Sequence, residues 1–396
     1  MRLLLGAFGD PGHAFPIIAL GRALAARGHE VVVQTWVRWQ DDVEAGGMRF
    51  AAAPEYHVFP TRERPLKPYE AVRRAAEHTV PLVEELRPDA VVSDILTLAP
   101  ALAGELRGVP VATLVPHLDP RGSPGMPPYS IGARPPRTAL GRRLWRAADR
   151  VVAKGLEHGR AELNETRRRL GLPPLAHVHG GISRDLCLLA TFPQLEAVRP
   201  LAPATHAVGP LLWEPPFDDE PPEAPGDGPL VLVAPSTSQD PSQALLRATL
   251  AGLAGERVRV LATWNRRPPD PPLGPLPPNA TVVEWLRYSA AMPRADVVVC
   301  HGGHGTVVRS LSHGVPVVVV PAAGDMNENA ARVDWAGVGV RLPRRLCTPR
   351  AVRLAVRRAL REDALRRRAA ELAAWADRED PAARAAGLVE AFVSAR

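Results

Sequence analysis

Three histidines lie within one short segment, VVVCHGGHGTVVRSLSHGVPVVVVP, at residues 297–321. His301 and His304 are three residues apart, and His313 follows nine residues after His304. Imidazoles this close together are compatible with a metal site, with acid–base catalysis or with phosphate binding. The residues between the histidines decide among these three chemistries.

Small residues dominate the turn that follows His301. This histidine ends an apolar run, and a helix is expected to begin just behind it. The turn supplies Gly302, Gly303, Gly305 and Thr306. Glycines admit a ligand close to the backbone, and the N–H groups at a helix N-terminus attract anions. We therefore predict a diphosphate-binding turn in which His301 and Thr306 contact the ligand directly.

No metal site is predicted at this segment. His313 would lie more than two helical turns from His301, which is too far for both rings to bind one ion. We expect neither His304 nor His313 to contact the ligand, although His304 could face it. Acidic and thiol ligands are not predicted elsewhere, because Asp218-Asp219 lies in a proline-rich stretch and the cysteines are widely spaced. The cysteines are Cys187, Cys300 and Cys347.

A second candidate site lies in GAFGDPGHAFPIIAL, residues 6–20, where the first apolar run meets the first helix. The glycine spacing is GxxGxxG rather than the GxGxxG of dinucleotide-binding proteins. The second apolar run ends in Gln34-Thr35 and lacks the acidic residue that would bind a ribose. The sequence therefore argues against a nicotinamide cofactor.

His13 stands at this helix start. The helix dipole disfavours the imidazolium form there, which keeps the ring a free base able to accept a proton from a hydroxyl nucleophile. Asp94 follows the apolar run AVVS, at the strand edge where α/β proteins bind ligands, and could orient the His13 ring. A hydrogen-bonding role for His13 and a helix-capping role for Asp94 remain the alternatives.

Composition sets the broad class. The 396 residues are 46% hydrophobic, which fits two globular domains of about 150–200 residues each. No apolar run is long enough to cross a bilayer, and the N-terminus becomes polar after eight residues, so we expect neither a signal peptide nor a membrane span. A cytoplasmic location is the corresponding expectation.

The formal net charge of +7 raises the question of nucleic-acid binding. However, Lys67 and Lys154 are the only lysines, and the arginines are interleaved with Asp and Glu in helix-like stretches. Such a pattern is typical of solvated helix faces. We therefore predict no nucleic-acid partner.

The chain alternates short apolar runs with helical patterns, which predicts parallel sheets covered on both faces. Strands are expected at 2–8, 29–36, 90–94, 110–116, 230–236, 257–263, 281–285, 296–300, 315–321 and 339–342. Helices are expected at 16–28, 138–170, from 241, 303–313, from 327 and through most of 349–395. The acidic, proline-rich stretch 213–229 is the predicted linker. The fold class is α/β, with two Rossmann-like domains in series and a ligand site in the cleft between them.

Several motifs of the chain resemble those of a known protein family. Residues 285–329 are similar to the donor-binding signature of family 1 glycosyltransferases, which have the GT-B fold and include bacterial natural-product enzymes. The matching positions are Trp285, His301-Gly-Gly-x-Gly-Thr306, Gly314-Val-Pro316, Pro321, Asp325 and Asn329. Gly12-His13-x-x-Pro16 resembles the catalytic histidine motif of the same family, and Asp94 stands where its partner aspartate is expected. Ser236-Thr237 resembles the hydroxyl pair that opens the donor domain.

The resemblance covers essentially the whole chain and implies a domain organisation. It implies an acceptor-binding domain at 1–212, a linker at 213–229 and a nucleotide-sugar-binding domain at 230–375. Residues 376–396 would form a helix that crosses back onto the first domain.

The implied reaction is an inverting, metal-independent sugar transfer. His13 would deprotonate the acceptor hydroxyl, with Asp94 balancing the charge on the ring. His301, Thr306, Ser236 and Thr237 would stabilise the leaving nucleoside diphosphate, and Trp285 would stack on its base. The nucleotide sugar is a co-substrate, and no cofactor is implied.

The chain departs from the family pattern at the residues that read ribose and sugar. Arg309 replaces the usual Glu that binds ribose, and Met326 replaces the usual Gln that binds sugar hydroxyls. Arg287-Tyr288 replaces the usual Pro-Gln. Arginine cannot accept hydrogen bonds from a diol, but Arg309 could bind the donor by pairing with its phosphate, and methionine suits a deoxygenated ring. The hypothesis is a dTDP-deoxysugar donor, or UDP-glucose held in an atypical way.

The acceptor pocket is expected between segments 55–80 and 117–150. Its candidate lining residues are His57, Phe59, His117, Met126, Tyr129 and Trp145. This mixed aromatic and apolar lining predicts a hydrophobic acceptor such as a phenol, polyketide or macrolide. The enzyme is expected to be a monomer or a homodimer. The alternatives are a GT-B-fold nucleotide-sugar epimerase and a catalytically impaired glycosyltransferase-like partner protein.

Overall fold

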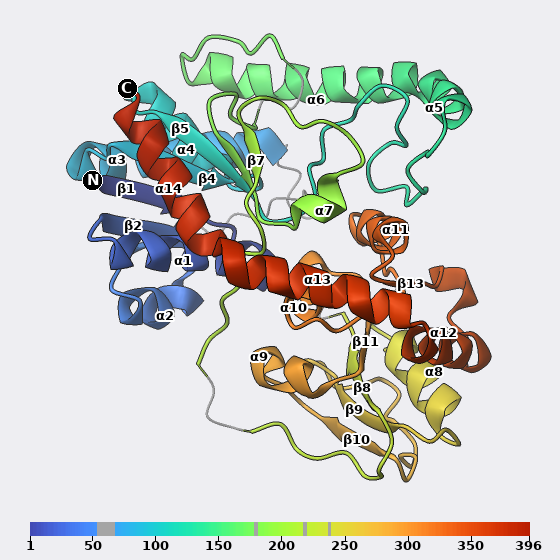
Figure 1. The fold of residues 1–396 in the computed structure, drawn as a ribbon. Coiled ribbons are helices and arrows are strands. Elements are labelled where there is room, and N and C mark those ends of the chain that lie inside the picture. The colour runs from blue at the N-terminus through green and yellow to red at the C-terminus, as the bar shows by residue number, and fades with distance from the viewer. Residues whose placement is uncertain (54–67, 178–180, 217–219, 237–238) are drawn as a thin grey trace.

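The computed structural model describes residues 1–53, 68–177, 181–216, 220–236 and 239–396. The chain forms two parallel sheets that are flanked by helices (Figure 1). The first has the order β3-β2-β1-β4-β5-β6-β7, and the second has the order β10-β9-β8-β11-β12-β13. The prediction of an α/β fold with two Rossmann-like sheets is confirmed.

The strands are short, and the central ones are fully buried. The first sheet comprises β1 (Arg2–Gly6), β2 (Glu30–Thr35), β3 (Arg49–Ala52), β4 (Ala90–Asp94), β5 (Val111–Val115), β6 (Cys187–Leu189) and β7 (Thr205–Ala207). The second comprises β8 (Leu230–Ala234), β9 (Arg259–Thr263), β10 (Ala280–Val283), β11 (Val297–Cys300), β12 (Val317–Val319) and β13 (Gly339–Arg341). Every residue of β4, β8 and β11 is buried, because helices cover both faces of each sheet. The edge strands β3 and β7 and their short neighbour β6 were not predicted, since three or four residues carry too little pattern.

The sequence expectation did not include α2, α3, α7 or α9, and the helices that it did include differ from the structure mainly at their ends. In the first half they are α1 (Pro11–Ala26), α2 (Gln40–Ala45), α3 (Pro68–Leu86), α4 (Leu98–Leu106), α5 (Ala139–Trp145), α6 (Asp149–Arg169) and α7 (Pro193–Glu196). In the second half they are α8 (Ala244–Leu253), α9 (Tyr288–Ala291), α10 (His304–Ser312), α11 (Met326–Ala336), α12 (Pro349–Arg361), α13 (Asp363–Glu379) and α14 (Pro381–Ser394). The first helix begins five residues earlier than predicted because Pro11 suits a helix start. The helical pattern at 138–170 divides into α5 and α6, joined by a 3₁₀ turn at Arg146–Ala148.

Strand order places the two candidate sites. β1 pairs with β4, with Gly6 opposite Ser93, so the loop after β1 and the residue after Ser93 lie at one sheet edge. In the second sheet Cys300 of β11 is opposite Ala234 of β8. The residues that follow these strands, including His301, therefore share an edge with the loop after β8. In both sheets this is the carboxyl edge, where α/β proteins bind ligands.

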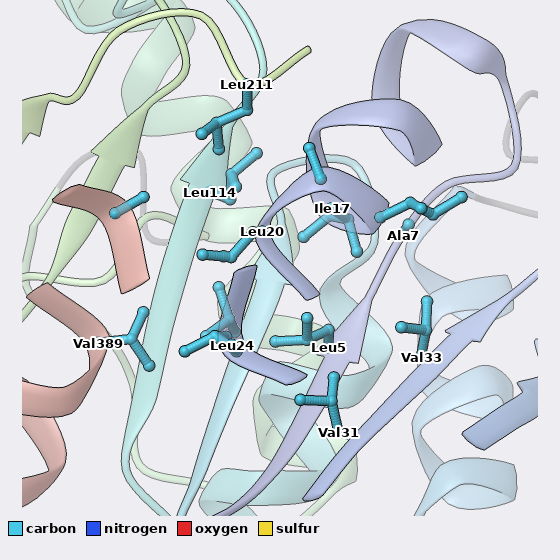
Figure 2. Close-up of a cluster of buried hydrophobic side chains, with 14 of the residues drawn as sticks. Leu5, Ala7, Ile17, Leu20, Leu24, Val31, Val33, Leu114, Leu211 and Val389 are labelled. Carbon is cyan, nitrogen blue, oxygen red and sulfur yellow. The ribbon is translucent and has the colours of Figure 1, made fainter. Parts of the chain in front are cut away.

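The C-terminal helices link the second half of the molecule to the first. Figure 1 shows α13 and α14 running from the second sheet to the first, and α14 packs against α1. Val389 of α14 is buried in the cluster that contains Leu20 and Leu24 of α1 (Figure 2). At the rim of this contact, Glu390 accepts hydrogen bonds from Arg27 at 2.7 and 2.6 Å and pairs with His29 at 2.7 Å.

The α1–α14 contact should measurably stabilise the protein. Val389→Ala removes two buried carbon atoms and leaves a cavity, so we expect a loss of about 1–3 kcal/mol in the free energy of unfolding. The matched control is Ala391→Ser, because Ala391 is exposed on the same helix and should stay within about 0.5 kcal/mol of wild type. Urea denaturation followed by circular dichroism measures both. Equal stability of the two variants would contradict this packing.

Candidate functional site

His13 and Asp94 meet at the carboxyl edge of the first sheet. His13 lies in the first turn of α1, and its Nδ1 is 2.8 Å from Oδ1 of Asp94. Asp94 is buried at the end of β4, and its Oδ2 accepts hydrogen bonds from the Phe8 N–H at 3.3 Å and the Thr97 hydroxyl at 3.4 Å. Since a carboxylate can only accept, Nδ1 carries the proton and Nε2 keeps its lone pair. This tautomer leaves Nε2 able to act as a base.

The electrostatics of His13 differ from the sequence argument. Burial lowers the pKa of the ring, but the charge and hydrogen bond of Asp94, with the charges of Asp10 and Asp325, outweigh burial and raise the pKa. The sequence argument considered the helix dipole and predicted that it would keep the ring uncharged. The neighbouring carboxylates favour the charged form instead. His13 is therefore a stronger base than an ordinary histidine.

The glycine turn follows β11 as predicted. Gly302 has φ +88°, and a Cβ there would lie 2.9 Å from Val319, so the position requires glycine. Helix α10 then begins at His304 with Gly303 as its N-cap, and no described side chain caps its N–H groups. Gly305 is exposed, with no heavy atom within 4 Å of where its Cβ would lie. The start of α10 is thus open to an anionic ligand.

His301 lies against this helix start. Its Nδ1 is 3.2 Å from the carbonyl of Ala234, and a Cβ on Gly303 would lie 2.4 Å from its Nε2. The carbonyl fixes the proton on Nδ1, so Nε2 faces Gly303 with its lone pair. Burial lowers the pKa of His301. A diphosphate would reverse this by favouring the charged ring, which could then donate from Nε2.

Asn329 and His304 brace the turn from behind. The Asn329 side-chain amide donates to the carbonyl of Gly302 at 2.8 Å, and its oxygen accepts from Nδ1 of His304 at 3.0 Å. Burial lowers the pKa of His304 to about 4, and its Nε2 has no hydrogen-bond partner among the described residues. The sequence predicts that Asn329 binds the donor. In this structure its side chain contacts the glycine turn at Gly302.

The other candidate donor residues line the carboxyl edge of the second sheet. Ser236 is buried, and its hydroxyl accepts from the N–H of Gln239 at 2.9 Å. Trp285 is half-buried beneath the Arg266 guanidinium, which lies 4.6 Å from the ring centroid. It lines a cavity of about 550 Å³ together with Glu220, Pro221, Pro222, Arg266, Val283, Glu284, Leu286 and Arg287. Thr306 is half-buried in the first turn of α10, and Thr237 lies outside the described residues.

Arg309 does not join these residues. Its Nη2 donates to the carbonyl of Trp213 at 2.7 Å, and its Nη1 lies 3.5 Å from Oε2 of Glu214. The other Glu214 oxygen accepts from the N–H of Ser289 at 3.0 Å. Arg309 therefore holds the start of the linker against α9 and α10. No local sequence pattern marks this contact, because the partners are almost a hundred residues apart.

On the acceptor side, the structure brings His117 and Tyr129 close to His13. The rings of His13 and His117 have centroids 6.4 Å apart, and Tyr129 places its hydroxyl 3.2 Å from Nδ1 of His117. Burial lowers the pKa of His117, whose Nδ1 also lies 2.7 Å from the Leu118 carbonyl. Met126 and Tyr129 line a small cavity of about 20 Å³, whereas Trp145 is half-buried on α5. His57 and Phe59 lie outside the described residues.

Helix α11 contacts the first half of the chain, which sequence reasoning did not predict. Its first residues are Asp325, the N-cap, and Met326. The charge of Asp325 adds to the raised pKa of His13 and partly offsets the lowering by burial of the pKa values of His117 and His301, so the start of α11 lies near these three rings. Asp325 and Met326, which the sequence predicts to bind the donor, therefore belong to a helix start that lies close to His13.

Arg332 anchors α11 to the first half of the chain. Its Nη1 donates to the carbonyl of Leu195 at 3.1 Å and lies 3.8 Å from Glu196, while its Nε is 2.8 Å from Glu328. All three charged side chains are buried, and burial raises the pKa of Glu196. Further along α11, Arg134 pairs with Asp334 and Arg137 donates to the Trp335 carbonyl at 3.1 Å.

Among the described residues, no group of three or more His, Cys, Asp or Glu side chains is arranged to hold a metal ion. None of the helices described here is long and apolar enough to cross a membrane. The site consists of a His–Asp pair at one sheet edge and an anion-binding turn at the other. This combination, in two Rossmann-like domains, is the arrangement expected of a GT-B glycosyltransferase.

Comparison with known proteins agrees with this class. Residues 248–390 match the family described as "Erythromycin biosynthesis protein CIII-like, C-terminal domain". The chain is 31% identical to 4'-demethylrebeccamycin synthase of Lentzea aerocolonigenes, over 99% of each chain. The crystal structure of the glycotransferase of kitacinnamycin has a TM-score of 0.77 at 22% identity and covers 99% of this chain and 98% of its own. Spinosyn rhamnosyltransferase SpnG, complexed with thymidine diphosphate, has a TM-score of 0.67 at 21% identity, over 99% of each chain.

The chain therefore belongs to the family of natural-product glycosyltransferases with the GT-B fold, and the protein is a glycosyltransferase. This assignment confirms the resemblance seen in the sequence. It also favours the transferase over the epimerase and partner-protein alternatives.

The buried Arg332 should be essential for the contact between α11 and the first half of the chain. Arg332→Met leaves the Glu196 and Glu328 carboxylates buried without their cation, so we expect a loss of about 3 kcal/mol in the free energy of unfolding. Adding Glu196→Gln should recover part of that loss, because it removes one uncompensated charge. The matched control is Arg368→Met, which breaks an exposed pair with Glu371 and should cost less than about 1 kcal/mol. Urea denaturation would contradict the anchor if Arg332→Met and Arg368→Met were equally stable.

Proposed function

We propose that this glycosyltransferase transfers a sugar from a nucleoside-diphosphate sugar to a hydroxyl group with inversion and without a metal. The observation that carries the proposal is the His13–Asp94 pair, with its protonated Nδ1 and free Nε2. The acceptor hydroxyl gives its proton to Nε2 of His13 as its oxygen attacks the anomeric carbon. The bond from that carbon to the phosphate oxygen breaks, and the nucleoside diphosphate leaves with the electron pair. Asp94 stabilises the imidazolium that forms.

The leaving group is stabilised by the turn at 301–306. The N–H groups at the start of α10 carry partial positive charge, and no described side chain caps them. His301 gains a proton as the diphosphate binds and donates from Nε2, and the Thr306 hydroxyl adds a further contact. These groups supply the positive potential that a metal ion supplies in other transferases.

The donor is a dTDP-linked deoxysugar. In the family pattern a glutamate binds the ribose diol, but here Arg309 occupies that position and is held by Glu214. A thymidine nucleotide has no 2'-hydroxyl and therefore needs no residue that reads a diol. Met326 at the start of α11 offers an apolar contact for a deoxygenated sugar carbon. SpnG, a rhamnosyltransferase complexed with thymidine diphosphate, is a structural neighbour that supports this choice.

The acceptor is a hydrophobic small molecule of the phenol, polyketide or macrolide type. His117 and Tyr129 lie beside His13, so the nucleophilic hydroxyl would approach Nε2 between aromatic side chains. His117 remains uncharged at neutral pH because burial lowers its pKa, and it therefore does not repel the imidazolium of His13. An aromatic or apolar ring stacked there would be recognised by contact area rather than by charge.

His13 as the base predicts a specific pH dependence. The ring must be unprotonated to act, so kcat/KM should fall as pH falls through the raised pKa, with the acid limb above the ordinary value of 6.5. Asp94→Asn removes the charge that raises this pKa, so the limb should move to lower pH while the maximal rate falls. His13→Ala should lose about 10²–10⁴-fold in rate with little change in affinity for the nucleotide. Product formation with a panel of nucleotide sugars and phenolic or macrolide acceptors, read by mass spectrometry, measures this; equal product from wild type and His13→Ala would refute the proposed base.

The donor proposal predicts a preference among nucleotides. Isothermal titration calorimetry should give tighter binding of TDP than of UDP or GDP, and a dTDP-deoxysugar should react faster than UDP-glucose. Met326→Gln restores a hydrogen-bonding side chain and should shift the kcat/KM ratio toward UDP-glucose. Thr306→Val serves as the control, because it should weaken TDP and UDP binding alike. A clear preference of the wild type for UDP-glucose would refute the deoxysugar donor.

A further inference from the structure

The segment from α5 into the first half of α6 is an unusual helical region, because it buries almost nothing. No residue of α5 or of the following 3₁₀ turn is buried, and the buried residues of α6 all lie at 163–167. Three large apolar side chains are exposed instead: Leu140 at 68%, Leu144 at 70% and Val151 at 75%. Helices in folded proteins gain most of their stability from a packed apolar face. These exposed apolar side chains on neighbouring helices therefore indicate a surface that is covered in the functional state.

The charge of the same region narrows down what covers it. Residues 139–156 contain five basic residues and a single acidic one. The basic residues are Arg142, Arg143, Arg146, Arg150 and Lys154, and all are exposed. Within the described part of the chain, no carboxylate lies within ion-pair distance of any of the five. Asp149, the acidic residue, is half-buried, and one of its oxygens accepts from the N–H of Gly125 at 3.3 Å.

The later part of α6 behaves differently. Arg160 pairs with Glu157 at 3.0 Å, and Arg168 and Arg169 pair with Glu165 at 2.8 Å each. Arginines are common throughout this chain, so their presence alone indicates little. What distinguishes residues 139–156 is that the cations there are unpaired and stand beside exposed leucines. We call this region, with its five cations and Leu140, Leu144 and Val151, the α5–α6 surface.

We propose that the α5–α6 surface docks the enzyme reversibly on anionic lipid bilayers. Exposed Leu side chains flanked by unpaired Arg and Lys are the pattern of helices that lie in the membrane interface. The apolar groups enter the headgroup boundary, and the cations are attracted to the negative surface of the leaflet. The apolar side chains extend over roughly 15 Å of helix, which suits an extended counter-surface better than a single small molecule. Figure 1 shows α5 and α6 along an outer edge of the molecule.

A second copy of the chain fits this surface poorly. A symmetric dimer would bring five unpaired cations of one copy against the same five of the other, which costs free energy. An acidic protein is the remaining alternative. Binding to it would require the cations but not the exposed apolar side chains. An anionic bilayer is compatible with both the cations and the exposed apolar side chains of this surface.

Docking has a consequence that rests on the proposed function. The loop that carries His117 and Tyr129 runs directly into α5 and exposes Ile131 at 51%. A bilayer bound at α5 would therefore lie next to the chain segment that contacts the acceptor. A hydrophobic acceptor dissolved in the bilayer could reach the site from there. The surface would raise the local concentration of acceptor without touching the reacting atoms.

The experiment is co-sedimentation of the full-length protein with vesicles of phosphatidylcholine alone or with 30% phosphatidylglycerol, at low and high salt. The wild type should bind the anionic vesicles in preference, and 0.5 M salt should release it. Arg146→Gln with Arg150→Gln should weaken binding about 25-fold, at about 1 kcal/mol per cation and 1.4 kcal/mol per factor of ten. Leu144→Ser should weaken it about tenfold without changing the net charge.

The matched control is Arg361→Gln with Arg367→Gln, which removes two exposed cations outside this surface and should retain wild-type binding. Circular dichroism and thermal unfolding confirm that each variant is folded. No binding of the wild type to anionic vesicles would overturn the proposal and leave the acidic protein as the partner. Equal loss in the control pair would also overturn it, since binding would then follow net charge alone. Because neither donor nor acceptor is needed, the result is independent of the proposed reaction.

Discussion

In the proposed reaction, catalysis depends on the hydrogen bond between His13 and Asp94, and the fold brings these two residues together. The two residues are 81 positions apart, and only the pairing of β1 with β4 brings them to one sheet edge. The Phe8 N–H and the Thr97 hydroxyl hold the second oxygen of Asp94, so the carboxylate has one orientation available. A buried carboxylate with three donors fixes both the tautomer and the position of the imidazole.

Helix α11 imposes the second constraint. The charge of Asp325 at its N-terminus acts on three of the histidines, while its middle is anchored to the first half of the chain through Arg332. A buried ion pair contributes little net stability compared with apolar packing, but it tolerates few alternative geometries. Arg332 therefore affects the relative orientation of the two halves of the chain more than the net stability of their contact. Donor and acceptor sides are linked through one helix.

The sequence predicted the fold and the central site residues because both have local signatures. Continuous apolar runs separated by helical periodicity gave the parallel sheets, and the glycines after His301 indicated the anion-binding turn. The Arg332 anchor and the Arg309–Glu214 contact could not be predicted, because their partners are distant in sequence and no local pattern marks them. The direction of the His13 pKa was missed because only the helix dipole was considered. The charge and hydrogen bond of Asp94, with the charges of Asp10 and Asp325, outweigh burial and raise the pKa.

Arg309 shows why a departure from a family pattern does not by itself reveal a ligand. The sequence suggested that this arginine meets the nucleotide, but in the structure its guanidinium faces Trp213 and Glu214 of the linker. Losing the family's ribose contact and gaining a new contact to the nucleotide would have different consequences for donor specificity.

Four histidines follow strands at the carboxyl edges of the two sheets, and their environments give them different pKa values. Burial lowers the pKa of His117, His301 and His304, so these rings are uncharged at neutral pH before substrate arrives. His13 alone has a raised pKa, because it alone has a carboxylate in hydrogen-bonding contact. If all four rings were charged, they would attract a diphosphate but could not deprotonate a hydroxyl. If all four had the ordinary pKa of histidine, they would do neither well. In the proposed mechanism, the strongest base therefore stands where the proton must be removed, and the ring of His301 becomes charged only when an anion binds at the start of α10.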